Sequence, residues 1–176
     1  MPFAYYRKLT RAQKAIYRRS DAVTSIPLPQ PEALTPLVDP IRHALAGDDR
    51  LATQRATAAL CRALCKALAV PTVSVRVLAR RPANAAGELH GLYEREDGKR
   101  AIVRVWMRTA ARQEVVALRT FVRTVLHELC HHLDYELLKL KDSFHTEGFF
   151  RRESSLARQL LPPSRRRSGQ LELPLD

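Results

Sequence analysis

The chain has 176 residues, of which 30 are Lys or Arg and 18 are Asp or Glu, so its formal net charge is +12. This length allows one domain with a sizeable core and excludes a large multidomain enzyme. A content of 45% hydrophobic and 27% charged residues excludes a wholly disordered chain. The positive charge favours an anionic partner, with nucleic acid as the first candidate. The sequence has no apolar run of about 18 residues and no signal-peptide pattern in residues 1–15, so we expect a cytoplasmic protein, either free or associated with the nucleoid.

The first 47 residues are expected to form a basic segment followed by a linker. Residues 1–20 contain no acidic residue, and tyrosines lie between the cations, which favours a short basic helix on a phosphate backbone; the alternative is a solvated, frayed terminus. The candidate DNA-binding cations are Arg7, Lys8, Arg11, Lys14, Arg18 and Arg19. Five prolines between residues 27 and 40 then exclude one continuous helix and predict a Pro-rich linker up to residue 47.

The middle of the chain predicts a helix followed by strands. Residues 48–69 are rich in Ala and Leu, which predicts a helix with an aspartate as its N-cap. Apolar and polar residues alternate in residues 72–79, and two further strand-like runs, 88–96 and 100–108, flank the turn Asp97-Gly98. We therefore expect a small, mainly antiparallel sheet.

The last third of the chain predicts two helices and a tail. Residues 110–140 have apolar side chains at helical spacing, and residues 149–161 predict a final helix that ends at a pair of prolines. Residues 163–176 are expected to form a flexible basic tail. The sequence thus predicts one α+β domain over residues 48–162.

The chemistry-bearing motif lies within the longest predicted helix and reads His127-Glu128-Leu129-Cys130-His131. Residues four apart share one face of a helix, so the two histidines can bind one metal ion while Glu128 lies beside a metal-bound water. Zinc suits this set because it accepts nitrogen and oxygen ligands and lowers the pKa of its water towards neutrality. We expect Glu128 to act as general base. Cys130 is expected to pack in the helix interface, and His132 to face solvent or to form a local hydrogen bond.

A catalytic zinc ion normally has three protein ligands, and His145 is the expected third ligand. It follows His131 by fourteen residues, where a turn between two helices can bring the chain back to the metal. Glu147 and Glu153 are the competing ligands. Asp142 and Glu147 are alternatively expected to orient the imidazoles through their free N–H groups.

These residues resemble the SprT-like metallopeptidases, the family that includes the Spartan proteases of DNA–protein crosslink repair. The likeness covers residues 50–161 and includes the sequence HELCHH and His145 followed by Phe149. The resemblance implies a minimal zincin-like fold and a zinc ion held by three histidines, here His127, His131 and His145, with Glu128 as base. It also implies that a strand before the active-site helix, within residues 87–96 or 100–108, pairs with an extended peptide substrate.

The chain departs from many SprT-like proteins because it lacks their C-terminal cysteine zinc ribbon. DNA binding is therefore expected from other cations, and the alternative is a merely solvated basic surface. The candidates are the basic N-terminal segment, Arg80 and Arg81, the run Arg104, Arg108 and Arg112, and the tail residues Arg165, Arg166 and Arg167. The tail also carries a sequence similar to the Gln-Leu-x-Leu-x-Leu peptides that dock on the bacterial sliding clamp. Its residues are Gln170, Leu171, Leu173 and Leu175. The alternative is that these leucines pack back on the domain or occur by chance.

The function expected from the sequence is that of a zinc metalloendopeptidase acting on proteins bound or crosslinked to DNA. One alternative is a regulatory protease with a single protein substrate, for which the positive charge is incidental. The other is a non-catalytic, zinc-stabilised adaptor between DNA and the sliding clamp. Tyr93 and Tyr135 are candidate oxyanion donors, although no motif supports either.

Overall fold

A computed structural model of the protein describes residues 3–84 and 87–162. The predictions made for Arg165, Arg166, Arg167, Gln170, Leu171, Leu173 and Leu175 lie outside these residues. In chain order the elements are η1 (Ala4–Lys8), α1 (Arg11–Ala22), α2 (Pro31–Leu34), η2 (Thr35–Leu37), α3 (Val38–Ala46), α4 (Arg50–Ala67), β1 (Ser74–Arg80), β2 (Ala83–Asn84), β3 (Gly87–Glu88), β4 (Gly91–Glu94), β5 (Ile102–Arg108), α5 (Leu118–Glu136) and α6 (Glu147–Leu160). The predicted α+β class is confirmed.

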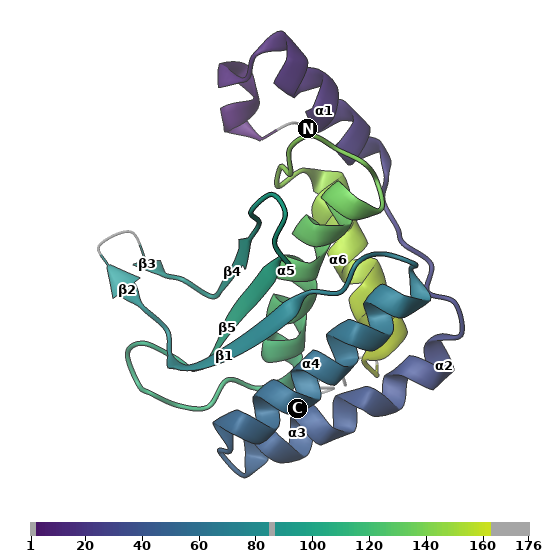
Figure 1. The fold of residues 1–176 in the computed structure, drawn as a ribbon. Helices are drawn as coiled ribbons and strands as arrows, with labels where there is room; N and C mark the ends of the chain where they lie inside the picture. The colour runs from purple at the N-terminus through teal and green to yellow at the C-terminus, as the bar shows by residue number, and fades with distance from the viewer. Residues whose placement is uncertain (1–2, 85–86, 163–176) are drawn as a thin grey trace, which may run out of the picture.

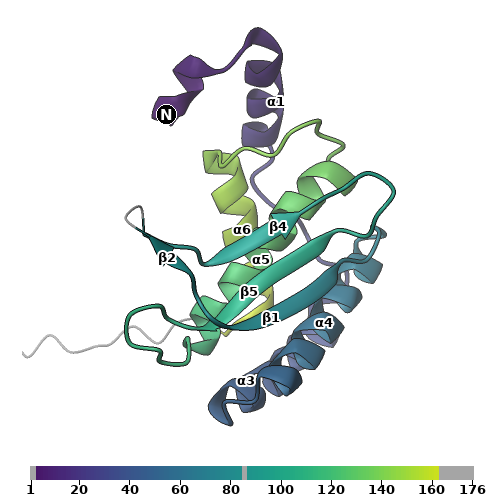
Figure 2. The same ribbon diagram turned by 60° about the vertical axis from the view of Figure 1, so that its left-hand side comes forward.

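The central sheet has three strands in the order β1-β5-β4 (Figure 2). Strands β4 and β5 are antiparallel and flank the predicted Asp97-Gly98 turn, whereas β1 and β5 are parallel. The expected small sheet is present, and it is mixed, with one parallel and one antiparallel pair of strands. After β1 the chain runs through the short β2–β3 hairpin and β4 before it enters β5, so β1 pairs with a strand that is not its neighbour in the sequence.

One face of the sheet holds the core. Alternate residues of β1 and β5, among them Val77, Val103 and Val105, are fully buried and belong to the same core cluster as α4 and α5. Figure 2 shows α5 behind the sheet and α4 alongside β1. On the other face Arg76 is exposed and Arg104 is half-buried. The alternation of apolar and polar residues thus sets which side of the sheet the helices cover.

Two helices, α5 and α6, contain or adjoin the candidate site. The predicted start of α6 is close to the observed one, whereas the predicted start of α5 is not. Helix α5 begins at Leu118 rather than near residue 110, because residues 110–112 form a turn that lets Val115 pair with Arg108 in a β-bridge. Helix α6 begins at Glu147, where the Thr146 side chain accepts a hydrogen bond from the Phe149 N–H. A threonine N-cap satisfies one of the free amide groups in the first turn.

The Pro-rich segment is part of the domain, which corrects the expectation of a linker ending at residue 47. The residues of α2 and α3 that join the common core are Leu34, Val38, Ile41 and Leu45. Pro31 occupies the first turn of α2, a position where proline's missing N–H costs no hydrogen bond. Pro31 and Pro36 therefore lie in the first turns of short helices, and this segment is not an unstructured linker.

The basic N-terminal segment is folded as well. Helix α1 starts at a capping box formed by Thr10 and Gln13, and it buries Tyr17 and Ser20. It lies at the top of the molecule in Figure 1, beside the start of α6. The predicted short basic helix is present, and one of its faces packs on the domain. None of the helices in the described residues is long and apolar enough to span a membrane.

The packing of α3 leads to a stability prediction. Ile41 is completely buried in the core, so Ile41→Ala should lower the free energy of unfolding by about 2 to 5 kcal/mol. Leu51 on the neighbouring α4 is 53% exposed, and Leu51→Ala should change this free energy by less than about 0.5 kcal/mol. Urea unfolding followed by circular dichroism measures both changes. Equal, small effects of the two substitutions would show that α3 is a linker after all.

Candidate metal centre

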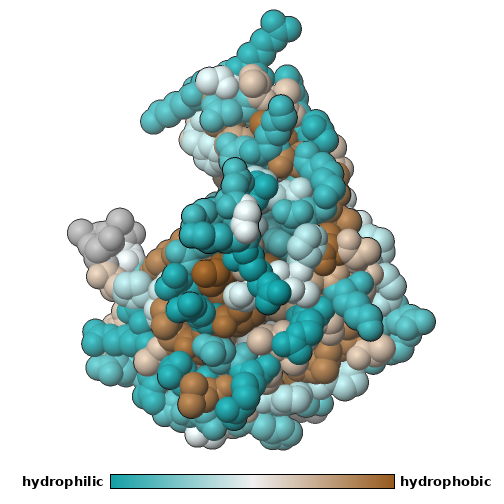
Figure 3. All heavy atoms as spheres, viewed as in Figure 1, coloured by the Kyte–Doolittle hydropathy of each residue, from teal (hydrophilic) through white to brown (hydrophobic). Residues whose placement is uncertain are grey.

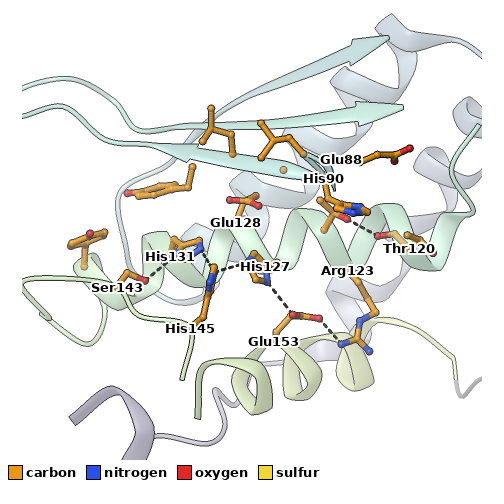
Figure 4. Close-up of a pocket in the computed structure, with 16 residues that line it drawn as sticks. Glu88, His90, Thr120, Arg123, His127, Glu128, His131, Ser143, His145 and Glu153 are labelled. Carbon is orange, nitrogen blue, oxygen red and sulfur yellow. Dashed lines mark hydrogen bonds and ion pairs between the residues drawn. The ribbon is translucent and has the colours of Figure 1, made fainter. Parts of the chain in front are cut away.

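Helix α5 positions the first two histidines of the candidate metal centre. His127 and His131 lie one helical turn apart, and the irregular segment between α5 and α6 brings His145 against them (Figure 4). The Nε2 atom of His145 lies 3.0 Å from that of His127 and 3.1 Å from that of His131. Ligand atoms of the three residues all lie within 4.8 Å of one another. The three predicted histidines are thus close enough to hold a metal ion.

The donor set fits a first-row transition metal. Tetrahedral coordination with metal–nitrogen bonds of about 2.0 to 2.1 Å places neighbouring nitrogens about 3.3 Å apart, close to the two separations found here. Burial, together with the neighbouring His145 and His127, lowers the pKa of His131 to about 3. Burial also lowers the pKa of His145. Both rings are therefore neutral near pH 7 and have a free lone pair for a metal.

Glu153 of α6 orients the His127 ring. One of its carboxylate oxygens lies 3.2 Å from His127 Nδ1, and the other accepts a 2.5 Å hydrogen bond from Arg123. Burial alone would raise the pKa of Glu153, but the hydrogen bonds from His127 and Arg123 outweigh it and lower that pKa. An ionised carboxylate can only accept, so His127 Nδ1 donates to Glu153, and His127 Nε2 faces the other histidines.

A second chain of hydrogen bonds orients His131. Its Nδ1 lies 2.7 Å from Ser143 Oγ, and the Ser143 hydroxyl donates over 2.7 Å to Asp134. Asp134 in turn accepts a 2.7 Å hydrogen bond from Arg152, and both of these side chains are completely buried. Burial raises the pKa of Asp134, whereas Arg152 and Ser143 oppose that shift. Direct contact with a guanidinium that keeps its proton holds the carboxylate in its ionised form.

Asp134, Ser143 and Arg152 are functional residues that the sequence analysis missed. A signal was available for Asp134, since a charged residue three positions after His131 falls on a predicted buried helix face. Of the acidic alternatives, Asp142 accepts a hydrogen bond from the Ser143 N–H, and Glu147 pairs with Arg151. Within the part of the chain that the structure describes, the metal-binding cluster contains the three histidines and none of these carboxylates.

The N-terminal segment holds the chain around His145. The Tyr5 hydroxyl donates a 2.8 Å hydrogen bond to the His145 carbonyl, and the Asp21 carboxylate accepts one of 2.9 Å from the Gly148 N–H. A Cβ atom at Gly148 would lie 2.3 Å from the Asp21 carbonyl oxygen. The glycine therefore allows the end of α1 to dock on the start of α6. Sequence analysis assigned this segment to DNA binding and missed its contact with the site.

Glu128 lies in a tight space between α5 and β4. Its side chain accepts a hydrogen bond from the Tyr93 backbone N–H, and burial raises its pKa to about 7. A Cβ atom at Gly91 would lie 2.3 Å from a Glu128 carboxylate oxygen. Glycine at this position is what permits the acid to sit beside the strand. An acid with a pKa near neutrality can both accept and return a proton, which suits general acid–base chemistry.

A cavity of about 840 Å³ opens between β4 and the two site helices. Its lining includes Leu89, Gly91 and Tyr93 from the strand side, and Glu128 and the three histidines from the helix side (Figure 4). Strand β4 is at the edge of the sheet, whereas β5 lies between β1 and β4. Of the two candidate substrate strands, residues 100–108 are therefore excluded, because β5 is paired on both sides.

The expectation that His132 faces solvent or forms a local hydrogen bond is wrong. Its side chain is buried, with Nε2 donating over 2.7 Å to the Pro71 carbonyl, while Nδ1 lies 3.1 Å from the Tyr93 hydroxyl. His132 thus holds Tyr93, whose ring stacks on His131 at a centroid distance of 6.2 Å. This contact uses the Tyr93 hydroxyl and weakens its candidacy as an oxyanion donor. Cys130 is completely buried in the core, as predicted.

Comparison of the chain with protein-family models, with curated proteins and with solved structures finds no match. The class of protein that the fold and site define is therefore an α+β domain with a three-histidine cluster able to hold a metal ion beside a buried glutamate. Membership of the SprT-like family therefore stays a prediction from the motif residues.

Removal of the Ser143 hydroxyl should weaken metal binding. Without it His131 loses the partner that fixes its ring, so Ser143→Ala should reduce metal affinity by about 10- to 100-fold. Thr124 is a matched control, because it also lines the cavity but its hydroxyl donates to the Thr120 carbonyl. Competition with a chelator, with zinc as the test metal, measures the affinities. Equal affinities of Ser143→Ala and Thr124→Ala would contradict the orienting role.

Burial of Glu128 predicts a pH-dependent stability difference. Its pKa is about 7 in the folded chain against 4.5 as an ordinary value. As the pH rises from 4.5 to 7 the unfolded state loses this proton first, so the metal-free wild type loses stability. The neutral Glu128→Gln variant lacks this loss and should gain about 3 kcal/mol over wild type at pH 8, with no such gain at pH 4. Denaturant unfolding in chelator at both pH values tests this, and a pH-independent difference would contradict it.

Proposed function

We propose that this protein is a zinc-dependent metalloendopeptidase, similar to the SprT-like enzymes, that cleaves proteins bound or crosslinked to DNA. The observation that carries the proposal is the convergence of three imidazoles beside a buried glutamate in the lining of one cavity. Three histidine ligands leave a fourth position for water or substrate in a tetrahedral site. The hydrogen bond between Glu153 and His127 favours an orienting carboxylate over a fourth ligand, which argues against the closed, structural site of an adaptor.

The residues of the site have distinct roles in the proposed reaction. His127, His131 and His145 would hold the zinc ion, which when bound polarises a peptide carbonyl and lowers the pKa of its water. Glu128 accepts the proton of the attacking water and returns it to the leaving amine. Its pKa near 7 allows both steps, and Gly91 leaves the space for its carboxylate.

An extended peptide is the substrate form that the cavity favours. Strand β4 is an edge strand along one wall of the cavity, so a peptide can add to the sheet by backbone hydrogen bonds. Recognition through the backbone is largely independent of side-chain sequence. This supports a protease for varied DNA-bound proteins over a regulatory protease for one substrate.

The cations of the N-terminal segment support a role at DNA. Arg7, Lys8, Arg11, Lys14, Arg18 and Arg19 form no ion pair with any described residue. Phosphate groups could neutralise them, with salt-dependent and sequence-independent binding. In this proposal the tail peptide from Gln170 to Leu175 docks on the sliding clamp and raises the local concentration of the protease at replicating DNA.

The test compares the zinc-loaded wild type with Glu128→Gln on a basic protein crosslinked to DNA. Loss of the general base should lower the cleavage rate by about 10²- to 10⁴-fold while zinc stays bound. Gly91→Ala should cause a similar loss with zinc retained, because its Cβ displaces the Glu128 carboxylate. Gel electrophoresis and metal analysis provide the two readouts.

The same assay separates the alternatives. Cleavage that is unaffected by free DNA would favour a regulatory protease. A wild type that binds zinc and DNA but cleaves none of the proteins offered, with Glu128→Gln indistinguishable from it, would overturn the peptidase proposal and favour the adaptor.

A further inference from the structure

A second hollow of about 610 Å³ lies on the outer side of α6, directly beside the metal centre. It is formed by residues from the N-terminus, the segment after α1, and α6. Its lining residues are Phe3, Thr24, Ser25, Glu147, Phe150, Arg151, Ser154 and Arg158. Neither the metal-binding cluster nor the proposed substrate cavity uses any of them.

Two exposed aromatic rings stand in this hollow. Phe3 is 41% exposed and Phe150 is 38% exposed, and their rings meet edge to face at a centroid distance of 6.0 Å. Each ring is supported from behind, Phe3 by stacking on Tyr5 and Phe150 by stacking on His145. Large aromatic side chains that remain exposed while others hold them in place present a ready surface for a flat ligand.

The surroundings of the hollow are strongly basic. Arg158 lines it and forms no ion pair with a described residue, while Arg151 pairs with Glu147 and offsets the acid in the lining. The neighbouring η1 and α1 add six cations and a single acid, Asp21. Figure 3 shows a predominantly hydrophilic surface over α1, at the top of the view. An exposed pair of aromatic rings in a hollow lined by Arg158, with a basic segment nearby, is complementary to an anionic ligand with aromatic groups.

We propose that this hollow binds single-stranded nucleic acid, with a base packed against the exposed aromatic pair Phe3 and Phe150 and the backbone phosphates beside Arg158 and the cations of η1 and α1. Stacking on aromatic side chains together with a basic groove is the usual way of binding single strands without sequence preference. In a duplex the bases are already stacked on one another and are not free to contact the rings. The inference rests on the proposed function and extends it to the form of DNA and the place where it binds.

The hollow lies close to the candidate metal centre. The Phe150 ring stacks on the metal ligand His145 at 5.7 Å and lies 6.0 Å from the His127 ring. A strand in the hollow would therefore lie next to the metal centre. A protein attached to that strand is held within reach of the cavity at β4, so the site would favour DNA-bound substrates by proximity.

The decisive experiment uses Phe3→Trp in the full chain as a reporter. The chain's one native tryptophan, Trp106, is buried in the sheet and gives a constant background. Titration with a single-stranded oligothymidylate of about 12 nucleotides should quench the new fluorescence. A hairpin duplex with the same number of phosphates, and a single strand of abasic sugars, should bind through charge alone and leave the fluorescence unchanged.

Two substitutions test which residues contribute to the affinity for single-stranded DNA. Phe3→Ala should weaken single-strand binding, measured by fluorescence anisotropy, by about 5- to 100-fold, and Arg158→Ala should weaken it and reduce its salt dependence. Leu51→Ala and Arg55→Ala are matched controls, because both residues are exposed on α4, away from the hollow, and both should bind as wild type.

The result that would overturn the inference is equal binding of single strand and duplex, with no quenching in Phe3→Trp and no loss in Phe3→Ala. These are binding measurements, so Glu128→Gln should behave as wild type in all of them. A protein that binds single strands at Phe3 but cleaves nothing would refute the peptidase proposal and leave this site standing.

Discussion

The ion pair between Arg152 and Asp134 is the interaction on which the rest of the site depends. Both side chains are completely buried, and the guanidinium also donates to the carbonyls of Ser20 and Val23 at the end of α1. Removing one partner of such a pair leaves an uncompensated charge in the core, at a cost of about 3 to 5 kcal/mol. One side chain of α6 therefore joins α1, α5 and α6 into a single unit.

Hydrogen bonds connect this ion pair to the candidate metal centre. From Asp134 the hydrogen bonds continue through Ser143 to His131, while Glu153, next to Arg152 on α6, orients His127. The Arg152–Asp134 ion pair thus both stabilises the packing of α1, α5 and α6 and helps to orient the candidate ligand His131. A ring held by a buried partner loses little entropy when it binds a metal, which is why residues behind the ligands affect affinity.

Strand β4 forms the opposite wall of the site, and the close packing of its side chains against α5 fixes its position. Gly91 leaves space for the Glu128 carboxylate, and the buried His132 holds Tyr93 against the His131 ring. Edge strand β4 is therefore attached to α5 through the same residues that carry the proposed chemistry. On the far side of His145, the N-terminal segment closes the site through Tyr5 and brings the exposed rings of Phe3 and Phe150 beside it.

By itself the sequence determined the features that depend on neighbouring residues: α4 with its aspartate cap, the β4–β5 hairpin, and the pair His127 and His131 on one face of α5. Short spacing and local periodicity are sufficient to predict these features. His145 could also be predicted, because it follows His131 by only fourteen residues. Only the tertiary structure decided the parallel pairing of β1 with β5, the docking of α1, and the contacts of Asp134 and Arg152. Those contacts join segments far apart in the chain, and which of them form depends on how all the buried surfaces pack together.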